Sequence, residues 1–112
     1  MSQLRITTHD TATGPVLAVS GELDYTSAPE LRALVAGVTL RPGQRLVLDL
    51  RGMEFCDSSG ITAMIAARGH ALDAGADIAL AAVPPHTLRV LRLVGLDQVF
   101  TVQADAETAD HS

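Results

Sequence analysis

The sequence contains no lysine and no tryptophan, and only 3% of its 112 residues are aromatic. Without lysine, the chain has no phosphate-loop lysine, no Schiff-base lysine and no lysine general base. The scarcity of aromatic residues makes a base-stacking surface improbable. The net charge of −5 leaves no surface that would neutralise a phosphate backbone. Direct nucleic-acid binding is therefore not expected.

The chain also has a single cysteine, Cys56, and no apolar run that approaches the length of a membrane span. One cysteine rules out an internal disulfide framework and suits a reducing compartment, so we expect a cytoplasmic location. No signal-peptide pattern opens the sequence, and no association with a membrane is expected. Apolar residues make up 47% of the chain, which is enough for one domain, residues 1–112, with a real core.

Hydrophobic periodicity and turn residues predict five strands and three helices. A turn is expected over His9–Pro15 and an exit loop over Gly21–Thr26. Ser27 and Glu30 have the spacing of a capping box, and Gly75 is placed to end a helix. The expected strands are Leu4–Thr8, Val16–Ser20, Leu46–Leu50, Ile78–Ala82 and Val99–Val102. A helix follows the second, third and fourth strands: the first begins at Ser27, the second covers about Ser59–Ala74, and the third begins at Pro84-Pro85. The residues expected on their apolar faces are, in the same order, Leu31, Leu34, Val35 and Val38; Ile61, Met64, Ile65 and Leu72; and Leu88, Leu91 and Val94.

The order β-β-α-β-α-β-α-β predicts an α/β domain. Right-handed crossovers make the helix-linked strands parallel, which gives a mixed, mainly parallel sheet with an antiparallel edge hairpin and helices packed against it. The core is expected over residues 4–103, followed by a polar tail over residues 104–112. Functional loops gather at the carboxyl ends of such strands, so Gly21–Thr26 and Cys56–Gly60 should lie side by side.

The most informative stretch is Phe55-Cys56-Asp57-Ser58-Ser59-Gly60-Ile61, which joins a buried strand to a helix. Backbone N–H groups at a helix N-terminus are unpaired and the helix dipole favours negative charge, so a phosphate on Ser58 would be tolerated there. The alternative is plain helix capping, in which Asp57 or Ser58 accepts hydrogen bonds from the next turn.

Other chemistries have less support. Ser58 with a histidine base would make a hydrolytic site, but the Gly-x-Ser-x-Gly pattern is absent and His70 lies about three turns along the helix. The four histidines and Cys56 lack metal-ligand spacing, so no metal is expected. A phosphoaspartate switch at Asp49 lacks an acidic pair after the first strand and a lysine partner. We therefore expect no enzyme and no bound cofactor.

Taken together, the segments resemble the anti-sigma factor antagonist family, the STAS domain. The resemblance covers about residues 4–103. It rests on Gly21-Glu22-Leu23-Asp24 with Ser27-Ala28-Pro29-Glu30-Leu31-Arg32, on Leu46-Val47-Leu48-Asp49-Leu50 with Phe55-Cys56-Asp57-Ser58-Ser59-Gly60-Ile61, and on Leu93-Val94-Gly95-Leu96-Asp97 with Val99-Phe100.

The resemblance implies a phosphorylation switch in bacterial transcription. The family's regulated serine falls on Ser58. Its partner is a serine kinase that is also an anti-sigma factor and that supplies ATP and Mg²⁺. The unphosphorylated form binds this partner and frees the sigma factor, phosphorylation ends the binding, and a separate serine phosphatase restores it. Some family members are instead non-switching scaffolds or subunits of stress-signalling or lipid-transport assemblies.

We predict that the partner binds one acidic surface with an apolar centre, made by the two adjacent loops. Ser58 should be the modified serine, with Ser59 turned towards the chain. The alternative is that Glu22 and Asp24 only shape and solvate a turn. The predicted partner-binding residues are Glu22, Asp24, Asp57, Ser58, Ser59, Gly60 and Ile61.

Overall fold

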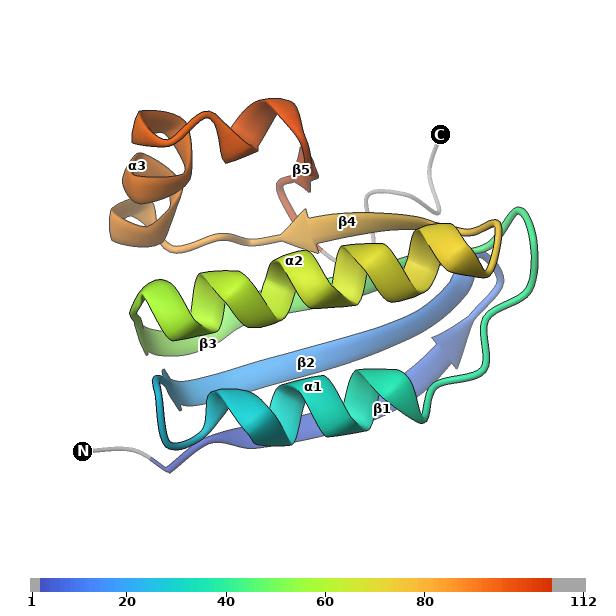
Figure 1. Ribbon diagram of the computed structural model, residues 1–112, viewed down its shortest axis with the longest axis horizontal. Helices are drawn as coiled ribbons and strands as arrows, with labels where there is room; N and C mark the ends of the chain where they lie inside the picture. Colours follow the sequence, from blue (N-terminus) through green and yellow to red (C-terminus); the bar gives the residue numbers. More distant parts are fainter. Residues whose placement is uncertain (1–2, 106–112) are drawn as a thin grey trace.

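The computed structural model describes residues 3–105 as one α/β domain (Figure 1). The element order matches the order expected from the sequence, with one short 3₁₀ helix added. The elements are β1 (Arg5–Thr11), β2 (Gly14–Leu23), α1 (Ala28–Ala36), β3 (Arg45–Cys56), α2 (Ser58–Asp73), β4 (Asp77–Ala81), α3 (Pro85–Leu93), η1 (Leu96–Gln98) and β5 (Thr101–Gln103).

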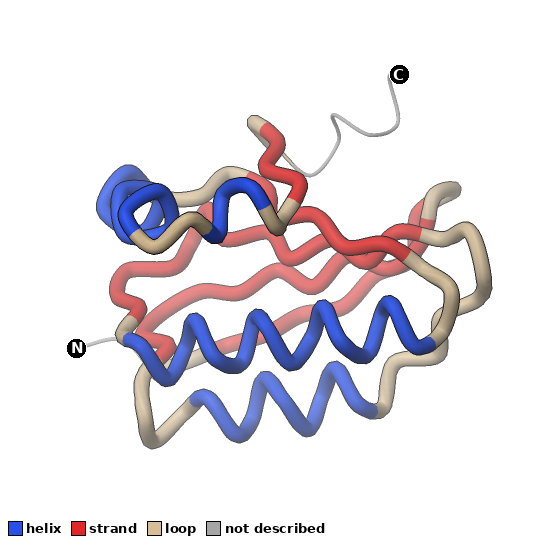
Figure 2. The backbone as a smooth tube through the Cα atoms, turned by 45° about the horizontal axis from the view of Figure 1, so that its top comes forward, coloured by secondary structure: helices blue, strands red, loops and turns tan. Residues whose placement is uncertain are grey.

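The five strands form one mixed sheet in the order β1-β2-β3-β4-β5. The β1–β2 hairpin at one edge is antiparallel, and the other three strand pairs are parallel. Helices α1 and α2 lie side by side across one face of the sheet, while α3 and η1 lie apart from them (Figure 2). The fold is therefore the one that the sequence predicted.

The main core fills the space between the sheet and these two helices. Leu17, Leu48 and Leu80 come from successive strands and are fully buried, and Leu31 of α1 and Met64 of α2 meet them. Because every strand before a crossover contributes such residues, the sheet and the two helices share one hydrophobic core.

Several strand boundaries were predicted too short. The predicted turn at His9–Pro15 is only the two residues between Thr11 and Gly14, which pair with each other. Gly21–Leu23, predicted as loop, continues β2, and Phe55 and Cys56 belong to β3 because they pair with Glu22 and Leu23. Pairing with a neighbouring strand thus extends each of these strands beyond the end predicted from the sequence.

The apolar face predicted for α2 is also wrong in part. Met64 is buried, but Ile65 and Leu72 are about half exposed. The small residues Gly60, Ala63, Ala67 and Ala71 occupy the buried face instead. Short side chains let α2 approach the sheet and α1 closely, and this close packing outweighs the burial of a few larger residues.

Three smaller differences concern the ends of elements. Ser27 precedes α1 but makes no side-chain capping bond to it, so the predicted capping box is absent. Val94 follows α3 and is 61% exposed. Val99 and Phe100 belong to the turn after η1, where both N–H groups donate to the Leu96 carbonyl, and β5 begins only at Thr101.

Candidate functional site

The carboxyl ends of β2 and β3 bring the two polar loops together, as the sequence predicted. Leu23 pairs with Cys56 in the last register position of the two strands. The Asp57 N–H then donates to the Leu23 carbonyl at 3.2 Å, and this bond joins the two loops directly. The first turn of α2 is thereby fixed above the end of β2.

Asp57 is the N-cap of α2. Its backbone is extended, and its Oδ1 accepts hydrogen bonds from the N–H groups of Ser59 at 2.8 Å and Gly60 at 3.1 Å. Of the two capping residues that the sequence left open, the structure therefore selects Asp57. Ser58, one position later, is free of the capping role.

Ser58 is the first residue of α2 and is exposed, whereas Ser59 is half-buried. The Ser58 carbonyl accepts a hydrogen bond from the Thr62 hydroxyl at 2.9 Å. Within residues 3–105, no side chain is hydrogen-bonded to the Ser58 hydroxyl. That hydroxyl therefore faces solvent at the positive end of the helix dipole.

Gly60 allows the close approach of α2 to the end of β2. A methyl group at this position would lie 2.7 Å from the Cys56 sulfur, 2.9 Å from the Leu23 Cγ and 2.9 Å from the Leu23 carbonyl oxygen. These distances are shorter than van der Waals contact, so Gly60 has a packing role beneath Ser58 and is fully buried. Ile61, which follows it, is half-buried.

Cys56 occupies the crossing between β3 and α2. Its thiol is half-buried and lies 3.5 Å from the Asp57 carbonyl oxygen. Burial, and secondarily the charge of Asp57, raises the pKa of the Cys56 thiol to about 12. The thiol is therefore neutral near pH 7 and a poor nucleophile.

Asp24 organises the loop between β2 and α1. Its Oδ1 accepts hydrogen bonds from the N–H and hydroxyl of Thr26 at 3.0 and 2.8 Å and from the N–H of Ser27 at 3.1 Å. The Ser27 hydroxyl donates to the Glu22 carbonyl at 2.8 Å. The Thr26 hydroxyl, more than the other donors, lowers the pKa of the Asp24 carboxyl. Asp24 thus shapes a turn, and the backbone carbonyl of Glu22, a half-buried residue at the end of β2, takes part in it through Ser27.

A shallow groove beside these loops was not anticipated from the sequence. It has a volume of about 170 Å³ and lies between the beginnings of α1 and α2. Ser59 and Thr62 line it from α2, and Tyr25, Ala28, Pro29 and Arg32 line it from the other side. Nothing in the spacing of Tyr25 and Arg32 along the sequence predicts that they line a groove together with residues of α2.

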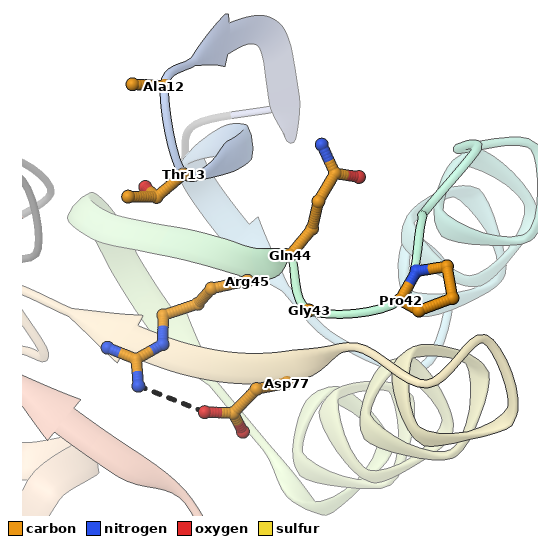
Figure 3. A pocket seen from close by; sticks show the side chains of 7 residues that line it. All are labelled: Ala12, Thr13, Pro42, Gly43, Gln44, Arg45 and Asp77. Atoms are coloured by element: carbon orange, nitrogen blue, oxygen red, sulfur yellow. Dashed lines mark hydrogen bonds and ion pairs between the residues drawn. The ribbon is translucent and has the colours of Figure 1, made fainter.

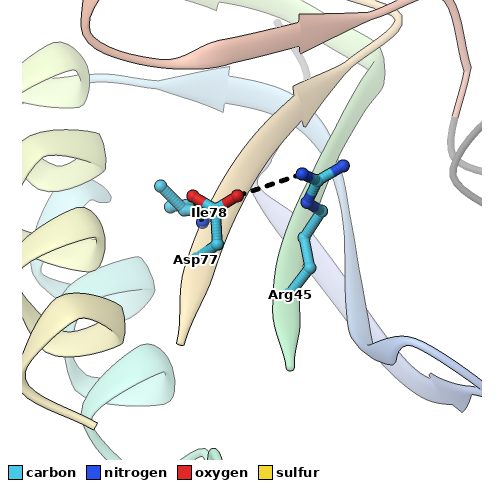
Figure 4. Close-up of polar contacts among 3 residues, drawn as sticks. All are labelled: Arg45, Asp77 and Ile78. Atoms are coloured by element: carbon cyan, nitrogen blue, oxygen red, sulfur yellow. Dashed lines mark hydrogen bonds and ion pairs between the residues drawn. The ribbon is translucent and has the colours of Figure 1, made fainter. Parts of the chain in front are cut away.

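A larger cavity of about 530 Å³ lies at the opposite end of the strands (Figure 3). Two strand beginnings are joined there, because the Arg45 Nη2 atom lies 3.0 Å from the Asp77 Oδ2 atom (Figure 4). The other Asp77 carboxylate oxygen accepts a hydrogen bond from the Ile78 N–H at 2.7 Å. The side chains of this ion pair are 34% and 53% exposed, so it contributes little energy, and β3 is held beside β4 by the pairing of the two strands.

His70, the histidine on the same helix as Ser58, is not placed to act as its base. His70 lies twelve residues further along α2, and its Nε2 atom lies 3.0 Å from the Val38 carbonyl oxygen. Among residues 3–105, no group of three metal-ligating side chains comes together. No helix in that range is long and apolar enough to cross a membrane.

Known proteins share both the sequence pattern and the fold. Residues 6–103 match the family model described as "Mlab, STAS domain". A STAS-domain containing protein of Pseudomonas aeruginosa is 29% identical over 86 residues, which cover 77% of this chain and 84% of that protein. An anti-sigma factor antagonist from Mycobacterium paratuberculosis superimposes with a TM-score of 0.84 at 28% identity, covering 97% of this chain and 92% of that one.

The Bacillus cell fate determinant SpoIIAA in its phosphorylated form has the same fold, with a TM-score of 0.71 at 19% identity and coverage of 97% of both chains. The family model spans nearly all of the residues that the structure describes. The chain therefore belongs to the STAS domain family.

Proposed function

We propose that this chain is an anti-sigma factor antagonist whose binding is switched by phosphorylation of Ser58. The unphosphorylated form binds an anti-sigma factor that is also a serine kinase and thereby releases the sigma factor. The proposal is supported by the likeness to the Mycobacterium paratuberculosis anti-sigma factor antagonist over nearly the whole chain. One geometric observation carries the choice of residue, the exposed Ser58 hydroxyl beside a cap that Asp57 already provides.

The phosphate is expected to leave the fold intact. It adds about −1.5 to −2 charges at neutral pH. The helix dipole favours that charge by about 0.3–1 kcal/mol, whereas the neighbouring Asp57 carboxylate opposes it. Because these local effects are small and opposite, the modified chain should keep its structure, and the switch must act at the interface with the partner.

A phosphate on Ser58 is expected to weaken binding to the partner strongly, because it would lie in the interface. A dianion placed against a surface that fits a small hydroxyl loses its hydration without gaining a partner, which costs several kcal/mol. Each 1.4 kcal/mol is about a tenfold change in affinity. Phosphorylation should therefore weaken binding by about a hundredfold or more.

The proposed contact surface comprises both loops at the carboxyl edge of the sheet. Glu22 and Asp57 give it negative charge, Ile61 gives it an apolar centre, and Ser58 and Ser59 lie between them. Asp24 adds a third carboxylate to this surface and also shapes its own loop, and Gly60 lies beneath the surface, where it allows close packing. Such a surface complements a partner that presents arginine or lysine.

In this function the chain is a protein substrate and carries no cofactor of its own. The partner kinase supplies ATP and Mg²⁺, a serine phosphatase removes the phosphate, and all three proteins act in the cytoplasm. The chain contacts neither nucleic acid nor membrane directly. Its effect on transcription passes through the sigma factor that the partner releases.

The test is phosphorylation of the purified chain by its cognate kinase with ATP and Mg²⁺, followed by phosphopeptide mass spectrometry. The expected result is one phosphate on Ser58, lost in Ser58→Ala and retained in the matched variant Ser59→Ala. Phosphate on Ser58→Ala, or none on the wild-type chain, would contradict the proposed switch.

We retain a second function because the description of the matching family model, "Mlab, STAS domain", does not mention an anti-sigma factor. In it, the chain is a non-switching STAS subunit of a stress-signalling or lipid-transport assembly. The two functions differ in one observable property. A subunit of this kind would remain bound in its assembly whether position 58 is serine, alanine or aspartate.

A further inference from the structure

The chain exposes two of its three aromatic residues. Phe100 is 3% exposed and belongs to the core, whereas Tyr25 is 79% exposed and Phe55 is 49% exposed. In so aromatic-poor a chain, placing two rings in water forgoes core packing that the fold could use. Both rings also lie at the end of the sheet where β2 and β3 finish and where α2 begins with Ser58.

Tyr25 lies on the helical side of this edge. It belongs to the loop between β2 and α1, where it lines the 170 Å³ groove together with Ser59 and Thr62 of α2. Arg32 lines the same groove. A partner group that enters here therefore meets an aromatic ring and a cation directly beside the residue that follows Ser58.

Phe55 lies on the other side of the sheet. Its neighbour Cys56 packs against the main core, and side chains alternate between the faces of a strand, so Phe55 faces away from α1 and α2. Phe55 pairs with Glu22 of β2, whose neighbour Leu23 is buried in that core. The ring and the Glu22 carboxylate therefore share one face.

The two rings thus lie on opposite faces of the sheet, near the ends of β2 and β3 that precede Ser58, and each has a different charge beside it. Exposed aromatic side chains that become buried in a complex are among the strongest contributors to binding. Glu22 beside Phe55 favours a basic partner group, whereas Arg32 beside Tyr25 favours an apolar or acidic one. This asymmetry favours one orientation of the partner.

We propose that Tyr25 and Phe55 are the two aromatic anchors with which this chain holds its protein partner. The partner presents one apolar recess flanked by basic side chains for Phe55 and a second recess, apolar or acidic at its rim, for Tyr25. This inference rests on the proposed function, because the partner is the same anti-sigma factor kinase. It also explains the strength of the switch, since a phosphate on Ser58 keeps water between the two rings and their recesses.

The experiment is calorimetric titration of the purified cognate kinase with the full chain and its variants. Tyr25→Ala and Phe55→Ala should each weaken binding at least tenfold. Leu72→Ala is the matched control, because Leu72 is 48% exposed, as Phe55 is, but lies near the other end of α2. The control should bind within twofold of the wild-type chain.

Two conservative variants separate the anchor role from loss of folding. Tyr25→Phe keeps the ring and should bind within about threefold, and Phe55→Leu keeps an apolar strand residue but should still bind at least fivefold more weakly. All variants should melt at the wild-type temperature. Wild-type affinity in both alanine variants would overturn this inference while leaving the proposed function standing. A wild-type chain that fails to bind the kinase would contradict the proposed function and the inference together.

Discussion

The substitution Gly60→Ala tests whether the first turn of α2 rests directly on the end of β2. The added methyl group would lie 2.7 Å from the Cys56 sulfur and 2.9 Å from the Leu23 carbonyl oxygen. The sulfur can move, but the carbonyl cannot, because it also accepts the hydrogen bond from the Asp57 N–H. Relief of the clash must therefore either displace α2 or break the bond that positions the cap.

The expected loss of stability follows from two opposing effects. Overpacking of a close-packed site costs about 1–3 kcal/mol. Replacing glycine with alanine inside a helix returns about 0.5–1 kcal/mol. Taking the middle of each range, the net loss should be about 1 kcal/mol, which for a domain of this size lowers the melting temperature by roughly 3–6 °C.

The matched control is Gly69→Ala in the same helix. No atom lies within 4 Å of a methyl group added at Gly69, so this variant should gain about 0.5–1 kcal/mol from helix propensity alone. Thermal melts followed by circular dichroism measure both variants. The packing explanation would be refuted by a Gly60→Ala chain that melts at or above the wild-type temperature, as the Gly69→Ala chain should.

Three further predictions concern residues at the carboxyl ends of β2 and β3. Asp57→Ala should lower the free energy of unfolding by about 1 kcal/mol through loss of the helix cap, with a smaller loss for Asp57→Asn; equal melting of all three chains would contradict the capping role. Because burial raises the pKa of the Cys56 thiol to about 12, iodoacetamide should modify this thiol roughly a thousandfold more slowly in the folded chain than in the chain unfolded by guanidinium. Equal rates of modification would refute the raised pKa. Because folding lowers the pKa of Asp24, the stability that its carboxylate contributes is present above the pKa of the unfolded chain and is lost as the pH falls through the pKa of the folded chain. Asp24→Asn keeps an oxygen acceptor but cannot titrate. Its melting temperature should therefore depend less on acid pH than that of the wild-type chain.

The order of elements was predictable because its signals are local. Gly75 ends α2 with a positive φ of 74°, as glycine at a helix end allows, and Asp57 precedes a helical pattern at capping distance. The parallel crossovers then follow from chain order. For the same reason, the meeting of the loops after β2 and β3 could be predicted without coordinates.

The details that failed depend on neighbours that are distant in sequence. Ile65 and Leu72 gave a convincing apolar face, yet α2 turns Met64 and its small residues inward, where they pack against the sheet and α1. Asp24 is predicted to belong to the acidic surface, and this stays a prediction; the structure adds that its Oδ1 accepts hydrogen bonds from Thr26 and Ser27. The exposure of aromatic side chains at the site leaves no periodic trace in the sequence.

The central claim is that a phosphate on Ser58 prevents binding without unfolding the chain. Its most direct test is calorimetric titration of the cognate anti-sigma factor kinase with the unphosphorylated chain and with the same chain after enzymatic phosphorylation, alongside thermal melts of both forms. We predict binding that weakens by about a hundredfold or more on phosphorylation, with melting temperatures that stay the same. Equal affinity of the two forms, or weak binding accompanied by unfolding of the phosphorylated form, would contradict the claim.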